Sequence, residues 1–133
     1  MQTSEKEIEI CRRFRSSVQI PGPEQKVGIA FSTLALKPLN ALRHPPEGET
    51  CGWYIWGGEK LSQDPKFFQS MHLSHLPRYC SQLLSYLALA PGLRVLLAPG
   101  QEDVWYDASL LNTIGPLSNV SRLTIYVSCV VQL

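Results

Sequence analysis

The sequence predicts a single α+β domain, in which a small, mostly antiparallel sheet is accompanied by an N-terminal helix and one central amphipathic helix. Three observations support this fold class. The chain of 133 residues has the length of one domain, and folding at this size buries roughly two thirds of the extended chain's surface. Hydrophobic residues make up 44% and charged residues 17% of the sequence, as is ordinary for a globular protein. Helical and strand-like patterns follow one another in mixed order, separated by Pro-Gly turn signals.

A helix is expected at the N-terminus, from about Ser4 to Phe14. Ser4 and Glu7 have the spacing of a capping box, and apolar residues then recur with the helical period. Acidic residues precede basic residues along this segment, as the helix dipole favours. The turn signal Pro21-Gly22-Pro23 follows, so residues 1–24 are expected to form a helix and its connector.

Strands are expected where β-branched and aromatic residues cluster between turn signals. Pro91-Gly92 and Pro99-Gly100, for example, bound one apolar run. The predicted strands are Lys26–Phe31, Thr50–Trp56, Leu93–Ala98, Asp103–Tyr106 and Arg122–Val131.

The central helix is predicted over Leu76–Leu89. Its apolar residues follow the i, i+3, i+4, i+7 pattern of a buried helix face, and they are Leu76, Tyr79, Cys80, Leu83, Leu84 and Leu87. Pro77 is compatible with this helix because it would lie in the first turn. No internal repeat, low-complexity tract or charge block divides the chain. We therefore expect one domain over residues 1–133, with a core over 25–111 and a C-terminal strand segment over 112–133.

Composition argues against several classes of protein. The net charge of +1 lacks the basic excess of a domain that binds nucleic acid. The apolar runs Tyr86–Ala90 and Leu123–Val131 are far shorter than the roughly 20 residues of a membrane span. The N-terminus lacks the apolar stretch of a signal peptide, and the cysteines form no Cys-x-x-Cys pair. We therefore expect a cytoplasmic protein with reduced thiols that binds neither nucleic acid nor membrane.

The segment Arg43–Glu59 combines prolines, glycines and tryptophans in one short window. Prolines favour an extended approach and glycines permit the turn that follows, so we expect a short strand held between two stiff turns, which places its aromatic side chains. Arg43 and His44 are candidates for a polar tether that clamps Glu47 or Glu59 at the surface. A structural role is expected for Arg43, His44, Pro45, Pro46, Gly52, Gly57 and Gly58.

His72 and His75, with Cys80 downstream, raise the question of a zinc site, since imidazole and thiolate are the usual ligands of zinc. A structural zinc site needs four ligands in paired clusters, whereas Cys80 falls on the apolar face of the predicted helix. We therefore expect no metal and no cofactor. We interpret His72 and His75 as residues that tether the loop to the start of the helix by hydrogen bonds.

The common catalytic motifs are absent from the sequence. It contains no Gly-x-Ser-x-Gly, no Walker loop and no paired-glycine dinucleotide fingerprint. Glu59 and Asp64 are the candidates for a carboxylate pair, but two acids near a turn are far more often solvated than catalytic. We therefore expect no catalytic residue and no enzymatic activity.

The segment Glu102–Asp107 places three acids around two large aromatic residues. No basic residue occurs between Gly100 and Ser121, so this part of the chain is locally acidic. An acidic surface with aromatic side chains is typical of a site that binds a basic partner. The alternative is that the acids form an ordinary solvated rim and that the tryptophans belong to the core, namely Trp53, Trp56 and Trp105.

An ordered series of segments runs through the chain: Leu39–Gly48, Gly52–Glu59, Asp64-Pro65 with Phe67-Phe68, His72 with His75-Leu76, Pro91-Gly92 and Glu102–Asp107. This series spans about Val27–Leu111 and resembles the bacterial immunity-protein family thirty-three and its close relatives. Members of that family are small cytosolic proteins associated with polymorphic toxin systems, where they bind and neutralise a cognate toxin. The resemblance implies a binder and not a catalyst. Cys51 departs from the small hydroxyl residue expected there, and the tail after Asn112 matches nothing in the family.

The residues and the resemblance together predict an immunity protein that neutralises a cognate bacterial toxin by direct protein-protein occlusion. We expect a monomer or a weak homodimer. The candidate partner-binding residues are Glu102, Asp103, Trp105, Tyr106, Asp107, Trp53, Trp56 and Glu59.

Two alternatives remain open. The first is a ligand- or metal-binding domain with a pocket lined by Trp53, Trp56, His72 and Glu59. The second is a homo-oligomeric scaffold in which Leu123–Val131 forms an unpaired edge strand.

Overall fold

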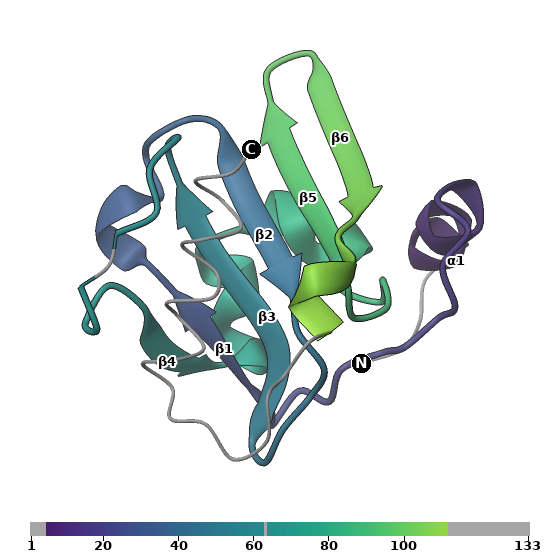
Figure 1. The fold of residues 1–133 in the computed structure, drawn as a ribbon, viewed down its shortest axis with the longest axis horizontal. Helices are drawn as coiled ribbons and strands as arrows, with labels where there is room; N and C mark the ends of the chain where they lie inside the picture. The colour runs from purple at the N-terminus through teal and green to yellow at the C-terminus, as the bar shows by residue number, and fades with distance from the viewer. Residues whose placement is uncertain (1–4, 63, 112–133) are drawn as a thin grey trace.

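A six-stranded mixed sheet forms the centre of the fold (Figure 1). The computed structural model describes residues 5–62 and 64–111. Among these residues β1 and β3 run parallel, and every other neighbouring pair of strands is antiparallel. The sheet and its N-terminal helix confirm the predicted α+β class. In spatial order the strands are β4 (Gln69–His72), β1 (Lys26–Ile29), β3 (Thr50–Gly57), β2 (Leu39–Arg43), β5 (Leu93–Ala98) and β6 (Gln101–Tyr106).

Four predicted strands correspond to strands of this sheet, namely β1, β3, β5 and β6. β1 ends at Ile29, earlier than predicted, because the chain turns into the short 3-10 helix η1 (Phe31–Thr33). β6 begins earlier than predicted, at Gln101, directly after the Pro99-Gly100 turn. The predicted strand Arg122–Val131 lies outside the described residues.

The sequence did not indicate β2 and β4. β2 has the sequence Leu-Asn-Ala-Leu-Arg, which contains no β-branched or aromatic residue. All of its residues are nevertheless buried, because β2 lies between β3 and β5 near the middle of the sheet. β4 is short, mostly exposed and polar, and it lies at the edge beside β1. Position in the sheet, rather than local propensity, therefore determines both strands.

The predicted N-terminal helix is present as α1 (Glu5–Arg13). Glu5 and Glu7 lie in its first turn, and two arginines lie in its last turn, which matches the direction of the helix dipole. Ile10 and Cys11 face the core. The predicted cap residue Ser4 lies outside the described residues.

The prediction of one continuous central helix over 76–89 is wrong. Two 3-10 helices occupy this region, η2 (Leu73–Arg78) and η3 (Ser81–Tyr86). Pro77 lies inside η2 rather than in a first turn, and it lacks the N–H that a continuing helix needs. The helices are separated at Cys80, whose φ of −142° and ψ of 64° are not helical. Within the described ranges, no helix combines the length and the apolar character needed to cross a membrane.

The two faces of the sheet carry separate hydrophobic clusters. On the first face, strand residues such as Val27 and Ile55 pack against α1, η2 and η3, the last two of which lie behind the sheet in Figure 1. On the second face, Leu42 and Trp56 pack with Leu110 of η4 (Ala108–Leu111), which lies in front of the sheet. Most apolar positions of the wrongly predicted helix still face the first cluster, but Tyr79 is exposed.

Candidate functional site

Arg43 is buried at the end of β2 and binds main-chain carbonyls. Only 2% of the surface of Arg43 is exposed. Its Nε donates to the carbonyl of Cys51 at 3.0 Å, and its Nη1 donates to the carbonyls of Gln19 and Leu89 at 2.7 Å each and of Leu87 at 3.3 Å. This guanidinium therefore joins β2 and β3 to the connector after α1 and to the segment after η3.

The prediction that Arg43 clamps Glu47 or Glu59 at the surface is therefore wrong. The two glutamates are exposed, whereas the guanidinium lies in the interior and bonds carbonyls. His44, which follows Arg43, is also buried at 2% exposure and meets the ring of Tyr54 edge to face at 6.0 Å between centroids. Both residues of the predicted surface tether are thus part of the interior.

The tryptophans of β3 are core residues. Trp53 is completely buried on the first face, where its Nε1 donates to the carbonyl of Leu87 at 3.0 Å. Trp56 is 2% exposed on the second face and packs in the cluster there. Neither indole therefore lies on the exposed surface, where a partner-binding residue was predicted. For these two residues, the core alternative is the correct one.

The glycines around β3 are required by close backbone approach. Gly52 has a φ of +97°, and a Cβ there would lie 1.9 Å from the carbonyl oxygen of His44. At Gly57 a Cβ would lie 2.0 Å from the carbonyl oxygen of Thr33. No side chain fits at either position, so the window of prolines, glycines and tryptophans serves to build the centre of the sheet.

His72 and His75 are exposed, and their ring centroids lie 6.1 Å apart. Neither imidazole forms a hydrogen bond with another described residue, so the predicted tether is wrong. Within residues 5–62 and 64–111, no three His, Cys, Asp or Glu residues are grouped to hold a metal ion. Burial raises the pKa of the Cys80 thiol to about 11, so this thiol is protonated at neutral pH.

The acidic segment of β6 is divided between the two faces of the sheet, because side chains alternate along a strand. Glu102 lies on the first face, where Arg13 of α1 donates to its Oε2 at 3.2 Å and the hydroxyl of Tyr86 forms a short hydrogen bond to the same oxygen. Burial, together with the Glu102 carboxylate, raises the pKa of Tyr86 to about 12. Glu102 thus connects β6 with α1 and η3.

Asp107, just after β6, is also engaged within the chain. Its carboxylate accepts hydrogen bonds from the main-chain N–H and hydroxyl of Ser109 and forms an ion pair with Arg94 at 3.3 Å. Burial opposes its ionisation, but these bonds outweigh burial and lower the pKa of Asp107. The buried guanidinium of Arg94 also lies 5.3 Å from the centroid of the Trp105 ring, which it supports.

The remaining residues of the acidic segment are accessible. Asp103 is exposed on the second face and accepts a hydrogen bond from Gln101 at 2.8 Å. Trp105 is partly exposed on the same face, and Tyr106 is 59% exposed. Sequence reasoning did not identify Arg94, although a single charge in the otherwise apolar run of β5 is the signal that indicates a buried ion pair.

A cavity of about 610 Å³ lies on the second face between β3 and β6. Its lining includes Trp56, Glu59, Arg94, Gln101 and Trp105. The alternative pocket of Trp53, Trp56, His72 and Glu59 is not formed. Trp53 lies on the opposite face and His72 lies on β4 at the far edge, so only Trp56 and Glu59 share this cavity.

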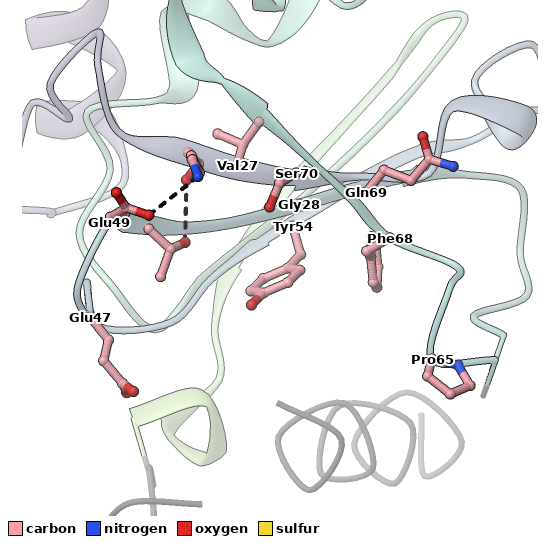
Figure 2. A pocket seen from close by; sticks show the side chains of 11 residues that line it. Val27, Gly28, Glu47, Glu49, Tyr54, Pro65, Phe68, Gln69 and Ser70 are labelled. Carbon is pink, nitrogen blue, oxygen red and sulfur yellow. Dashed lines mark hydrogen bonds and ion pairs between the residues drawn. The ribbon is translucent and has the colours of Figure 1, made fainter. Parts of the chain in front are cut away.

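A second pocket, of about 330 Å³, lies at the other side of the second face (Figure 2). The rings of Tyr54 and Phe68 meet edge to face there, with centroids 5.2 Å apart. Lys26 forms an ion pair with Glu49 at 3.2 Å, and the hydroxyl of Thr50 donates to the carbonyl of Lys26. Both contacts join the segment at the start of β3 to β1, so we interpret these side chains as structural.

Taken together, the fold and the site define a small α+β domain whose edge strand β6 carries accessible acidic and aromatic residues. A family model described as the Imm33-like domain matches residues 6–107. The chain therefore belongs to the Imm33-like family of immunity-protein domains, which implies a role in toxin immunity. The match includes α1 and ends directly after β6. No curated protein and no solved structure matches the chain.

Proposed function

We propose that this chain is a cytoplasmic immunity protein that binds a cognate bacterial toxin and neutralises it by direct occlusion, without catalysis. The observation that carries the proposal is the match of the Imm33-like model to residues 6–107, because it joins the whole sheet to a family of immunity proteins. The chemistry of the accessible side chains supports a role in binding.

The contact region that we propose is the β6 surface, defined as Gln101, Asp103, Trp105, Tyr106 and Glu59. Glu59 belongs to it because it lines the same cavity as Gln101 and Trp105. Trp53 and Trp56 are excluded by their burial, and Glu102 and Asp107 are engaged with residues of the chain itself. The β6 surface therefore keeps four of the eight predicted residues, Asp103, Trp105, Tyr106 and Glu59, and adds Gln101.

The residue types of the β6 surface suit a tight interface. Tryptophan and tyrosine dominate the residues whose loss costs most binding energy, commonly about 2 kcal/mol or more each. Trp105 is held in place by Arg94, so little side-chain freedom would be lost on binding. Glu59 and Asp103 give the surface a negative charge, which complements a basic partner and speeds its association.

Co-expression with the toxin encoded beside this chain's gene tests the proposal. Wild-type protein should protect the cell, and the triple variant Asp103→Ala, Trp105→Ala, Tyr106→Ala should lose protection while it remains folded by circular dichroism. The matched control is Glu24→Ala with Tyr79→Ala, which removes an exposed acid and an exposed tyrosine elsewhere. Full protection by the triple variant would show that the toxin binds another surface, and failure of the wild type to protect would remove the proposed function.

A further inference from the structure

Among the described strands β6 has no neighbour on its outer side, and the hairpin geometry shows which residues form this edge. β6 is the last strand of the described sheet (Figure 1). Ala98 pairs with Gln101 across a two-residue turn, and such a closing pair exchanges its backbone hydrogen bonds. At the other end of the strand, the N–H of Asp107 donates to the carbonyl of Gly92 at 2.7 Å. Both ends thus place odd-numbered residues in the hydrogen bonds with β5.

The even-numbered residues of β6 therefore direct their backbone groups away from the sheet. These residues are Glu102, Val104 and Tyr106. In the part of the chain that the structure describes, no backbone group pairs with their N–H or C=O groups on this side. Three donors and three acceptors in a row form a template for one more strand.

Three of the features that commonly protect an edge strand are missing from β6. Edges are commonly blocked by proline, by lysine or by a β-bulge. β6 contains neither residue, and its register with β5 runs without a shift from Ala98 to Leu93. The charged residues of β6 are Glu102 and Asp103. The Glu102 carboxylate bonds Arg13 and Tyr86 on the first face. A strand of six residues therefore offers about 20 Å of regular edge.

We propose that β6 binds an extended segment of the toxin as a seventh strand of the sheet, and that this segment carries basic side chains. The inference rests on the proposed function and specifies how the toxin is held. Main-chain hydrogen bonds to Glu102, Val104 and Tyr106 supply the binding, as in other cases of strand addition. Side chains on the second face determine which strand is accepted.

Charge and shape on the second face define the chemistry of the added strand. Its side chains on that face lie next to Asp103 and Trp105, since neighbouring strands bring opposite residues within about 5 Å. Lysine or arginine beside Asp103 forms a cross-strand ion pair, and a β-branched or aromatic residue packs on Trp105. A second copy of this chain would instead bring its own Glu102 and Asp103 to the edge, so its charges do not complement those of β6.

The test uses a pair of variants at the middle of the edge. Val104→Pro removes an outward N–H and leaves the hydrogen bonds with β5 in place, because the Val104 N–H points away from that strand. Val104→Ala is the matched control, since it loses the same side-chain packing and keeps the N–H. The readouts are the affinity for the toxin encoded beside the gene, and amide hydrogen exchange of Glu102, Val104 and Tyr106 in the full-length protein, free and bound.

We expect the three amides to exchange rapidly in the free protein and to be protected in the complex. Val104→Pro should weaken binding at least about tenfold relative to Val104→Ala, as expected for a lost hydrogen bond with a steric block. A wild-type complex in which these amides keep their free exchange rates overturns the strand addition and leaves the immunity function standing. Protection that appears without toxin also overturns it, because the added strand is then a second copy of this chain if protection grows with protein concentration, or another segment of the same chain if it does not. Absence of any complex removes both proposals.

Discussion

Arg43 shows how one residue determines the centre of this fold. Its guanidinium is buried, and no carboxylate of the described residues pairs with it. Carbonyls on segments far apart in the sequence accept its hydrogen bonds instead, and the Trp53 ring lies 5.7 Å from its Cζ. Burial lowers the pKa of this group, yet arginine is so basic that it stays charged at neutral pH. An isolated buried charge is costly, so these bonds must remain intact for the domain to fold.

We predict that Arg43→Lys destabilises the protein by roughly 2 to 4 kcal/mol. An ammonium group on a flexible stem cannot reproduce the planar set of bonds, and carbonyls left without donors keep their desolvation cost. Denaturant unfolding followed by circular dichroism measures the change. Arg12→Lys, at an exposed position of α1, is the matched control and should be neutral within about 0.5 kcal/mol. Equal stability of the two variants would contradict the structural role of Arg43.

The sequence predicts which face of the strand each candidate side chain lies on, but not whether that face is buried. Trp53 and Trp56 are three positions apart, so the alternation of a strand places them on opposite faces. Which face is covered depends on the neighbours of β3, and these come from distant parts of the chain. Similarly, the sequence indicates that Glu102 and Asp103 face opposite ways, but only the position of α1 shows that Arg13 pairs with Glu102.

At the scale of elements, polar contacts join the edge strand β6 to α1 and η3. Tyr86 of η3 and Arg13 of α1 meet on the carboxylate of Glu102, and α1 itself packs against η3. The ion pair of Arg13 is partly exposed, with the two side chains 49% and 31% accessible, so it contributes little. The buried tyrosine hydroxyl is therefore the main polar link between β6 and the helices.

We predict that Tyr86→Phe costs about 1 kcal/mol of unfolding free energy at neutral pH. The effect also depends on pH. The folded pKa of about 12 lies above the ordinary value of 10.0, so the hydroxyl's contribution is complete below pH 10 and is lost as the pH rises toward 12. Wild-type stability should fall more steeply than that of Tyr86→Phe over this range in urea titrations. Parallel curves for the two proteins above pH 10 would contradict this contact.

The elements themselves show why sequence patterns succeed in part. α1, β3 and β5 carry the correct period between clear turn signals, and their bounds follow the prediction closely. In the central region the apolar pattern identifies most of the buried positions, although Tyr79 is exposed. Pro77 and the break at Cys80 produce two short 3-10 helices in place of one helix. β2 has weak strand propensity, and it becomes a strand because β3 and β5 both pair with it.

At the scale of the whole molecule, the buried centre of the sheet and its exposed β6 edge are distinct regions. The window of prolines, glycines and tryptophans that resembles the immunity family builds the middle of the sheet, where β2 and β3 are covered on both faces. The edge strand β6 carries accessible acidic and aromatic residues, and others, such as Glu24 and Tyr79, are exposed elsewhere.

Calorimetric titration of the purified toxin, encoded beside the gene, into this chain tests the central claim most directly. We predict a one-to-one complex in which Trp105→Ala weakens binding by about 30-fold or more, the effect of losing a hot-spot residue worth about 2 kcal/mol. Tyr79→Ala, which removes an exposed aromatic of η2, should bind as the wild type does. A complex that forms with unchanged affinity when Trp105 is replaced would contradict recognition through β6.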